Sequence, residues 1–163
     1  GYINQFLSMF GIEPIQWLND PNMAIWALII FNIWSGLAFK IVIFLSGLQN
    51  IDPQYYKAAQ IDGTPKWKVF TRITLPLLSP TVFFLTITSV IGSFKVYNEV
   101  FALFGGKPGP ANSCMTVVYY IYDMFYGSSQ VHKAAAASII LFVIILIITG
   151  IQMLVSKKLV HYK

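Results

Sequence analysis

The chain has 163 residues, of which 56% are apolar and 10% are charged, and its formal net charge is +5. Soluble domains carry roughly 25% charged residues, so this composition excludes an ordinary water-covered exterior and favours a membrane protein. The basic residues stand in short clusters beside long apolar runs, which is typical of topology signals and argues against nucleic acid as a partner.

The first segment, residues 1–20, is mildly amphipathic. Its apolar side chains at Ile3, Phe6, Leu7 and Phe10 predict a helix lying along the membrane surface. The chain starts without an initiator methionine and shows no signal-peptide pattern. We interpret it as a fragment or a processed chain.

Three segments are long and apolar enough to span a bilayer, which takes about 20 residues of helix. They run from about 21 to 48, from 75 to 104 and from 134 to 156, and the second is interrupted by Lys95 and Glu99. The sequence therefore predicts an all-α fold, a polytopic transmembrane helical bundle with three spans over residues 1–163.

The connection between the first two spans, residues 50–74, is too long to lack structure. Asp52 and Pro53 are suited to begin one helix, and Gly63 to end it. A second short helix then reaches Leu75-Pro76, where the residue before proline disfavours further helix.

Aromatic residues mark one side of this second helix. Trp67, Phe70 and Ile73 recur every three residues, with lysines on the other side. From the residues alone, the helix pair is either a docking element or a surface anchor held in the lipid headgroups by Trp67 and the lysines.

Positive charges predict the orientation. The first connection holds Lys57, Lys66, Lys68 and Arg72, and the tail holds Lys157, Lys158 and Lys163. The opposite side has only Lys107 and Lys133 clear of the spans. The positive-inside rule makes the richer side, with the carboxy terminus, cytoplasmic and the amino terminus external; this orientation suggests that earlier spans are missing.

The loop also resembles a known motif. The run KAAQIDG from Lys57 to Gly63, followed by Phe70, Ile73, Leu75-Pro76 and Pro80, resembles the EAA loop of ABC importer permeases. The segments GYINQFL, WLNDP, FLSGLQNI and GGKPGP are similar to the carbohydrate subfamily, whose members include maltose, lactose and glycerol-phosphate permeases. Essentially the whole chain resembles the carboxy-terminal half of a type I permease with about six core spans.

This resemblance implies a coupling role for the loop from Lys57 to Pro80. In the family it docks on a cytoplasmic ABC ATPase, which binds ATP and Mg, so no cofactor is expected on this chain. The implied coupling residues are Lys57, Ala58, Ala59, Asp62, Gly63, Trp67 and Phe70. Lys57 replaces the usual glutamate. Either Lys57 meets an acidic partner, or this side of a heterodimer docks mainly through Ala58, Ala59 and the Trp67 face, and we favour the second interpretation.

The resemblance also implies further partners and a place. They are a second homologous permease subunit, in a heterodimer, an extracytoplasmic solute-binding protein and the lipid bilayer. The expected location is the plasma (inner) membrane of a prokaryote, with several spans. The expected function is ATP-driven import of a sugar or oligosaccharide by alternating access, without catalysis by this chain.

Polar residues inside spans are costly and mark solute paths. By the resemblance, the candidate substrate-binding residues are Asn32, Trp34, Ser35, Gly36, Ser89, Ser93, Lys95, Asn98 and Glu99. Simpler interpretations stay open. Lys95 and Glu99 are four residues apart and suited to form an ion pair at the interface, Ser89 to bond its own backbone, and Trp34 to face lipid.

Other residue types point away from different functions. Cys114, His132 and His161 are too isolated to predict a metal site. Four tyrosines near the third predicted span indicate an outer aromatic belt rather than a sugar platform: Tyr119, Tyr120, Tyr122 and Tyr126. A membrane enzyme would need a catalytic motif that the sequence lacks. The remaining alternatives are a non-transporting assembly or structural subunit and an importer of a non-sugar solute.

Overall fold

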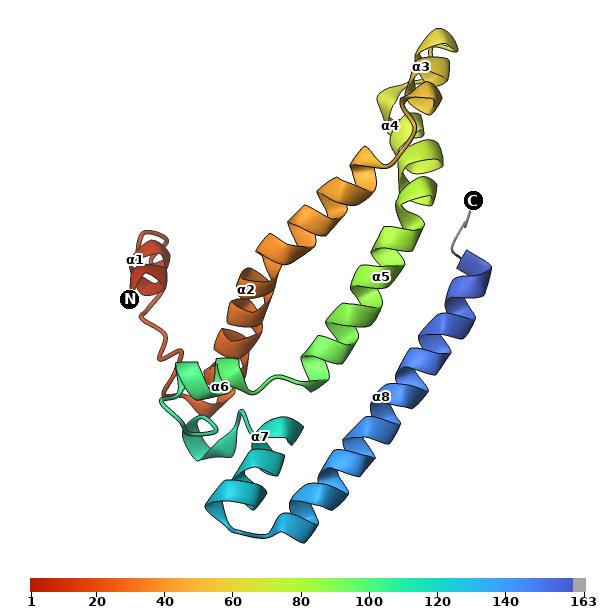
Figure 1. Cartoon of the computed structure of the whole chain (residues 1–163). Coiled ribbons are helices and arrows are strands. Elements are labelled where there is room, and N and C mark those ends of the chain that lie inside the picture. Colours follow the sequence, from red (N-terminus) through yellow and green to blue (C-terminus); the bar gives the residue numbers. More distant parts are fainter. Residues whose placement is uncertain (160–163) are drawn as a thin grey trace. The chain divides into compact units, whose positions relative to one another are not determined.

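The computed structural model describes residues 1–159, with side chains up to residue 156, and this part of the chain consists of helices and loops (Figure 1). The α-helices are α1 Tyr2–Ser8, α2 Pro21–Gln49, α3 Pro53–Ile61, α4 Lys66–Val69, α5 Leu75–Phe94, α6 Asn98–Leu103, α7 Val117–Tyr122 and α8 Val131–Leu159. The π-helices are η1 Phe70–Thr74 and η3 Asp123–Gly127, and η2 Pro110–Asn112 is a 3-10 helix. The predicted all-α class is confirmed.

Three helices are long and apolar enough to cross a membrane: Pro21–Gln49, Lys66–Phe94 and Val131–Ser156. In the most apolar stretch of each, the chain itself buries only 6%, 11% and 11% of the residues. Burial by this chain therefore does not explain their apolar composition. Lipid or other helices are the surroundings that suit such surfaces.

The chain divides into two compact units. Unit 1 comprises Gly1–Ser35 and Lys95–Ser138, and unit 2 comprises Gly36–Phe94 and the chain from Ile139 onward. Each of α2 and α8 is one continuous helix with residues in both units.

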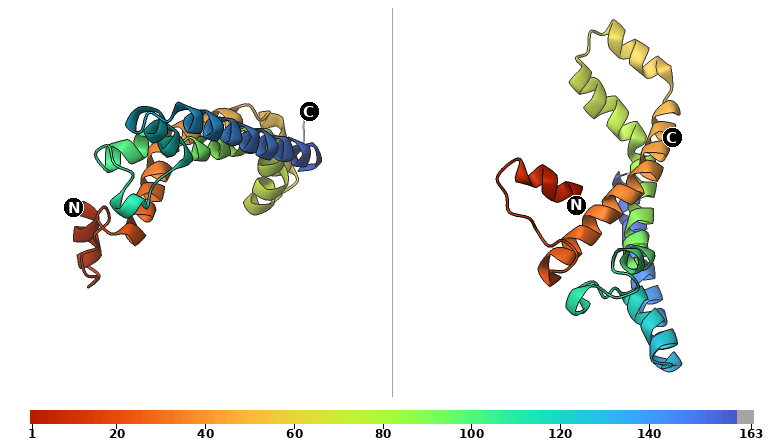
Figure 2. Two further views of the ribbon diagram at one scale, coloured as in Figure 1. Left: turned by 90° about the horizontal axis from the view of Figure 1, so that it is seen from below. Right: turned by 90° about the vertical axis from the view of Figure 1, so that its left-hand side faces the viewer.

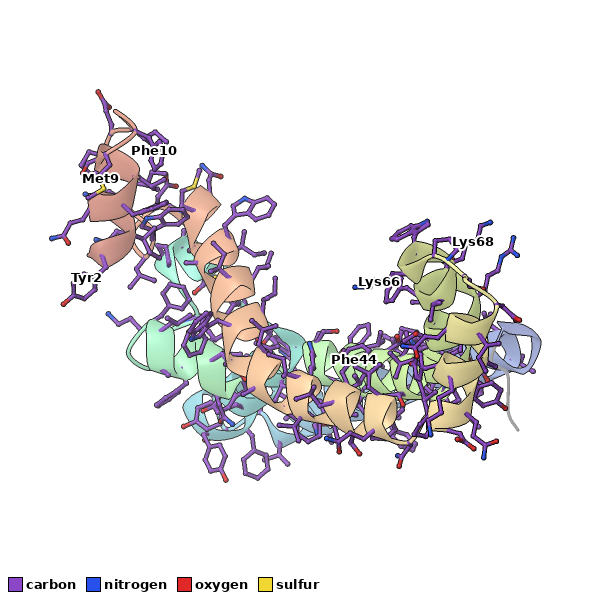
Figure 3. All side chains as sticks on the ribbon, turned by 90° about the horizontal axis from the view of Figure 1, so that it is seen from above. Tyr2, Met9, Phe10, Phe44, Lys66 and Lys68 are labelled. Atoms are coloured by element: carbon purple, nitrogen blue, oxygen red, sulfur yellow. The ribbon has the colours of Figure 1, made fainter. Side chains whose placement is uncertain are left out.

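The first helix is shorter than the amphipathic segment predicted over residues 1–20. It covers Tyr2–Ser8, and Gly11, with φ of +74°, lies in the turn that follows. Tyr2, Met9 and Phe10 are 89%, 82% and 69% exposed and project from this segment (Figure 3).

The core of unit 1 joins the start of α2 to the segment around α6 and α7. Ala24 and Leu28 of α2 are buried with Val100, Cys114 and Tyr119. Cys114, the single cysteine, is thus a core residue, because free cysteine packs as a small apolar side chain.

Helix α5 ends at Phe94, so the predicted second span up to 104 is wrong at its carboxy end. The Val96 carbonyl accepts a hydrogen bond from the Thr116 hydroxyl, and Tyr97, at φ −143° and ψ −54°, packs against Tyr122 with ring centroids 4.9 Å apart. These contacts hold the backbone out of the helix until α6 begins.

This break also removes the spacing on which a Lys95–Glu99 pair depends. The two residues are not one turn apart on a common helix, and no ion pair joins them in the part of the chain that the structure describes. Both residues remain accessible for other partners, since Lys95 is exposed and Glu99 is half-buried.

A second difference concerns Leu75-Pro76, which does not end a helix. The segments α4, η1 and α5 run together as one helix of 29 residues. In an α-helix the Pro76 ring would meet the carbonyl of Arg72, four residues earlier. The π turn over residues 70–74 is wider and moves that carbonyl, which explains why the helix continues.

Pro80 lies inside α5 and removes another backbone donor. Its missing N–H would have bonded the carbonyl of Pro76. Ser79 instead donates its hydroxyl to that carbonyl, with 2.6 Å between Oγ and O. The span therefore passes the proline without leaving this carbonyl unpaired in an apolar setting.

Residues 105–113, which follow α6, form turns around the short helix η2. Gly105, Gly106 and Gly109 have φ of +59°, +81° and +78°, values that favour glycine. The Tyr119 hydroxyl donates to the Gly106 carbonyl at 2.6 Å and is 5% exposed. Tyr119 therefore belongs to the core of unit 1, and its assignment to an aromatic belt is wrong.

Ionisation of Tyr97 and Tyr119 is disfavoured. Burial, together with the nearby Asp123 and Tyr122, raises the pKa of Tyr119, so its hydroxyl stays a donor. Partial burial and the adjacent Tyr122 raise the pKa of Tyr97 to about 12. The tail lysines Lys157, Lys158 and Lys163, and His161, lie outside the residues whose side chains are described.

Candidate functional site

The coupling candidate is the hairpin formed by α3 and α4 at the ends of α2 and α5 (Figure 2). Asp52 caps α3 by accepting the Gln54 N–H at 2.8 Å, and Pro53 occupies the first turn. Both features are the ones predicted from the sequence, because capping depends on local residue types alone.

The turn between the two helices depends on Gly63. Its φ is +63°, and the Thr64 N–H bonds the Ala59 carbonyl at 2.9 Å while the Gly63 N–H bonds the Gln60 carbonyl at 3.1 Å. No other group lies within 4 Å of the position that a Cβ would take at Gly63. The requirement for glycine is therefore conformational and not steric.

The hairpin presents an exposed apolar surface, which we call the coupling surface: Ala58, Ile61, Trp67 and Phe70. Ile61 is 86% exposed, Trp67 73% and Phe70 47%, and the Trp67 and Phe70 rings lie 6.0 Å apart. Such a surface is suited to burial against a protein or the headgroup layer.

The other predicted coupling residues divide by position. Lys57 and Asp62 are exposed, whereas Ala59 is only 5% exposed. Ala59 thus packs inside the hairpin and is not free to touch a partner, contrary to the expectation that it docks with Ala58. Lys66 and Lys68 extend from α4 on different sides (Figure 3).

One hydrogen bond ties α3 to the membrane helix. The Tyr56 hydroxyl lies 3.1 Å from the Thr74 Oγ1, and Thr74, the last residue of η1, is 8% exposed. The hairpin is thereby attached to α5 twice, through the continuous helix and through this side-chain contact. A groove of about 500 Å³ between α3 and α4 is lined by Tyr56, Gly63 and Phe70 among others.

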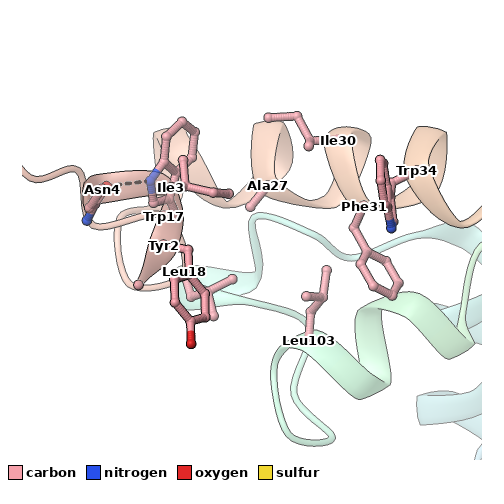
Figure 4. A pocket seen from close by; sticks show the side chains of 11 residues that line it. Tyr2, Ile3, Asn4, Trp17, Leu18, Ala27, Ile30, Phe31, Trp34 and Leu103 are labelled. Carbon is pink, nitrogen blue, oxygen red and sulfur yellow. Dashed lines mark hydrogen bonds between the residues drawn. The ribbon is translucent and has the colours of Figure 1, made fainter. Parts of the chain in front are cut away.

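Unit 1 contains a second candidate, a cavity of about 570 Å³ that we call the aromatic cavity (Figure 4). Its aromatic lining is Tyr2, Trp17, Phe31 and Trp34, with Leu103 of α6. Asn4 anchors one wall, because its Oδ1 accepts the Trp17 indole N–H at 2.8 Å and its Nδ2 donates to the Ile15 carbonyl at 2.9 Å.

Of the predicted substrate residues, one lines the aromatic cavity. It is Trp34, which is 75% exposed. Asn32 donates to the Leu28 carbonyl at 3.0 Å, and Ser35 donates to the Asn32 carbonyl at 3.3 Å. These two side chains therefore bond mainly along their own helix.

The remaining substrate-binding candidates are divided between the two compact units. Lys95, Asn98 and Glu99 belong to unit 1. Gly36, Ser89 and Ser93 belong to unit 2, where Ser93 donates to the Val90 carbonyl at 2.7 Å. Among the described residues Ser89 has no side-chain hydrogen bond, so the backbone bond considered for it is absent.

Sequence reasoning missed the aromatic wall supplied by the amino-terminal segment. Tyr2 and Trp17 are separated by a turn, and no periodic pattern brings them to one cavity. A usable signal was Asn4, a polar residue between the apolar side chains of Ile3 and Phe6, since it fixes Trp17.

The geometry defines a class of protein: a polytopic helical membrane protein with an exposed helical hairpin joined to one span. The family model "Binding-protein-dependent transport system inner membrane component" matches residues 4–161. The chain belongs to this family of multi-pass inner-membrane permease components.

Individual relatives agree. The lactose transport system permease protein LacF of Rhizobium radiobacter is 37% identical over 97% of this chain and 54% of its own length. The trehalose/maltose transport system permease protein MalF of Thermococcus litoralis is 33% identical over 96% and 52%. The chain spans about half the length of the curated relatives it matches.

A solved structure gives the same fold. It is the crystal structure of a bacterial ABC transporter involved in the import of the acidic polysaccharide alginate. It matches 99% of this chain and 56% of that chain with a TM-score of 0.83 and 28% sequence identity. The type I permease fold expected from the loop motif is thereby confirmed.

Proposed function

We propose that this chain is part of the permease of an ATP-driven importer and that the coupling surface transmits movement of a cytoplasmic ABC ATPase to the spans. The observation that carries the proposal is mechanical. The hairpin with its exposed Trp67 continues without a break through η1 into α5, and Tyr56 bonds Thr74 at the junction. A push on the hairpin therefore acts directly on a membrane helix.

The proposal assigns the partners as well. ATP and Mg bind to the ATPase, a second homologous permease completes the path as a heterodimer, and a solute-binding protein delivers the solute outside. In this arrangement the α3–α4 side and the carboxy terminus are cytoplasmic, in accord with the four basic residues of the loop, Lys57, Lys66, Lys68 and Arg72.

The solute in this proposal is a sugar or an oligosaccharide. The support is that the relatives named above carry lactose and trehalose/maltose in their names. The aromatic cavity adds chemistry suited to sugar rings, because Trp34 presents an open ring face. We assign Lys95, Asn98 and Glu99 as the polar contacts for hydroxyl groups.

The test of coupling uses the turn at Gly63 in the full-length permease, assembled with its partners in proteoliposomes. Gly63→Val forces a β-branched residue to φ +63° and should lower solute-stimulated ATP hydrolysis at least tenfold. Gly63→Asn is the matched control, because asparagine tolerates this backbone region, and it should retain most of the stimulation.

Equal stimulation in wild type and Gly63→Val, with both proteins assembled, would contradict the coupling role. Loss of the ATPase subunit on purification of Gly63→Val but not of Gly63→Asn would support docking at this turn. Basal ATP hydrolysis by the isolated ATPase serves as the reference in both cases.

A further inference from the structure

A charged residue lies deep inside the first span. Lys40 follows Pro21 by 19 residues and precedes Gln49 by nine in the continuous helix α2. With a rise of about 1.5 Å per residue, its Cα lies about 28 Å and about 14 Å from the two ends. Lys40 was not among the residues that the sequence singled out.

The Lys40 side chain does not extend toward the nearer end of the helix. Its Nζ lies 3.6 Å, and its Cε 3.7 Å, from the position that a Cβ would occupy at Gly36. Gly36 is about 20 Å from one end of α2 and about 22 Å from the other. The ammonium group therefore lies close to the middle of the helix, in space that glycine leaves open.

The three spans offer no counter-charge for this ammonium. All six acidic residues of the chain lie outside them: Glu13, Asp20, Asp52, Asp62, Glu99 and Asp123. Within the described part of the chain, no ion pair reaches Lys40. An unpaired charge at this depth is costly unless it faces water or meets an anion.

Lys40 lies on the side of α2 that approaches α5. At 100° per residue, Lys40 and Gly47 differ by about 20° around the helix. A Cβ at Gly47 would lie 2.9 Å from the Thr81 Cγ2 of α5, so the two helices are close there. Val42, about 160° from Lys40 and about 140° from Gly47, is 63% exposed on the opposite side.

We propose that Lys40 is an anion-binding residue of the solute path and that the transported solute is an acidic saccharide whose carboxylate or sulfonate binds the ammonium. The inference rests on the proposed transport function and narrows its substrate class. A neutral sugar leaves the mid-span charge unbalanced, whereas an acidic one supplies the anion that this chain's spans lack.

The first test asks whether Lys40 faces water, in the intact transporter with its partner subunits and with Cys114→Ser as background. Lys40→Cys should react with a membrane-impermeant methanethiosulfonate at least tenfold faster than Val42→Cys, the control at similar depth on the other side. Equal or slower reaction at residue 40 would overturn the proposal.

The second test asks whether the site attracts anions. Gly36→Cys places a thiol beside the ammonium and should react faster with an anionic than with a cationic methanethiosulfonate. Lys40→Met should lower this ratio at least fivefold, and Lys40→Arg should preserve it. A ratio that Lys40→Met leaves unchanged would show that a partner carboxylate already neutralises the lysine, which overturns the proposal.

The third test uses glucuronate and glucose as probes. Glucuronate should slow modification of Gly36→Cys when Lys40 is present and not in Lys40→Met, while glucose should have no such effect. Equal protection by both sugars contradicts an anion site. Binding-protein-stimulated ATP hydrolysis by wild type in the same vesicles reports on transport separately, so its absence counts against the proposed function and not against the site.

Discussion

At Pro80 the backbone of α5 has no N–H to give, and the hydroxyl of the preceding Ser79 takes over the bond to the Pro76 carbonyl. The same principle operates elsewhere in the chain. Asp52 accepts an N–H at the start of α3, and Tyr119 satisfies the Gly106 carbonyl in the loop after α6. Because an unpaired buried polar group costs about 1–3 kcal/mol, the Ser79 and Tyr119 hydroxyls stabilise the chain at these partly buried carbonyls. The Asp52 cap is exposed and stabilises the start of α3 as a helix cap does.

Among single residues, Trp34 gives the clearest test of the sugar proposal. We expect Trp34→Ala to raise the solute concentration for half-maximal uptake about tenfold, which corresponds to about 1.4 kcal/mol, because the open ring face of the aromatic cavity is lost. The control is Trp26→Ala, since Trp26 is also exposed on α2 but does not line that cavity.

The same uptake assay extends to Lys95→Ala and Asn98→Ala, which remove the proposed polar contacts. If solute uptake by Trp34→Ala and by both polar variants depends on solute concentration as in wild type, these residues do not bind the sugar. A similar effect of Trp26→Ala would indicate a general role of tryptophan at the lipid interface instead.

Among the elements, α3, η1 and α5 are connected so that movement of one acts on the next. The Tyr56–Thr74 contact joins α3 to η1, and η1 and α5 belong to one continuous helix. The exposed hairpin is therefore supported on both sides, as a lever requires.

We predict that Tyr56→Phe and Thr74→Val each reduce the number of solutes imported per ATP hydrolysed, by loosening this support. A double-mutant cycle should give a coupling free energy of about 0.5–1.5 kcal/mol in thermal unfolding of the purified protein. Tyr126→Phe is the control, because it removes the hydroxyl of a tyrosine outside the hairpin that is 70% exposed. Additive effects of the two substitutions would show that the contact contributes nothing.

How far sequence predicts these elements depends on the range of the interactions. The cap at Asp52, the turn at Gly63 and the start of α2 at Pro21 follow from neighbouring residues, and all were predicted correctly. The end of α5 at Phe94 depends on Thr116 reaching the Val96 carbonyl, 20 residues away. No local pattern contains that contact, so the second span was predicted too long.

The candidate sites show the same limit. Trp67 and Phe70 were predicted on an exposed face because helical periodicity defines it. The inward position of Ala59 and the placement of Trp17 beside the aromatic cavity result from tertiary packing. The continuation of the helix past Pro76 was not predicted, because the π turn that permits it has no simple residue signature.

At the scale of the whole molecule, the orientation across the membrane remains a prediction. We expect Asp62→Cys to react with an impermeant thiol reagent added from the cytoplasmic side and Ser128→Cys to react from the opposite side, in the Cys114→Ser background. Both positions are exposed, so access depends only on the side of the membrane. The reverse labelling pattern would overturn the topology and, with it, docking of a cytoplasmic ATPase at the hairpin.

The π turn at residues 70–74 also affects how the hairpin is oriented relative to α5. A π turn holds one more residue than an α turn, so it acts as an insertion within an otherwise regular helix. One residue corresponds to about 100° of rotation. The direction in which the docking hairpin points around the axis of α5 is thus set by the number of residues at this junction. It does not depend on which residues make up the hairpin surface or the faces of α5.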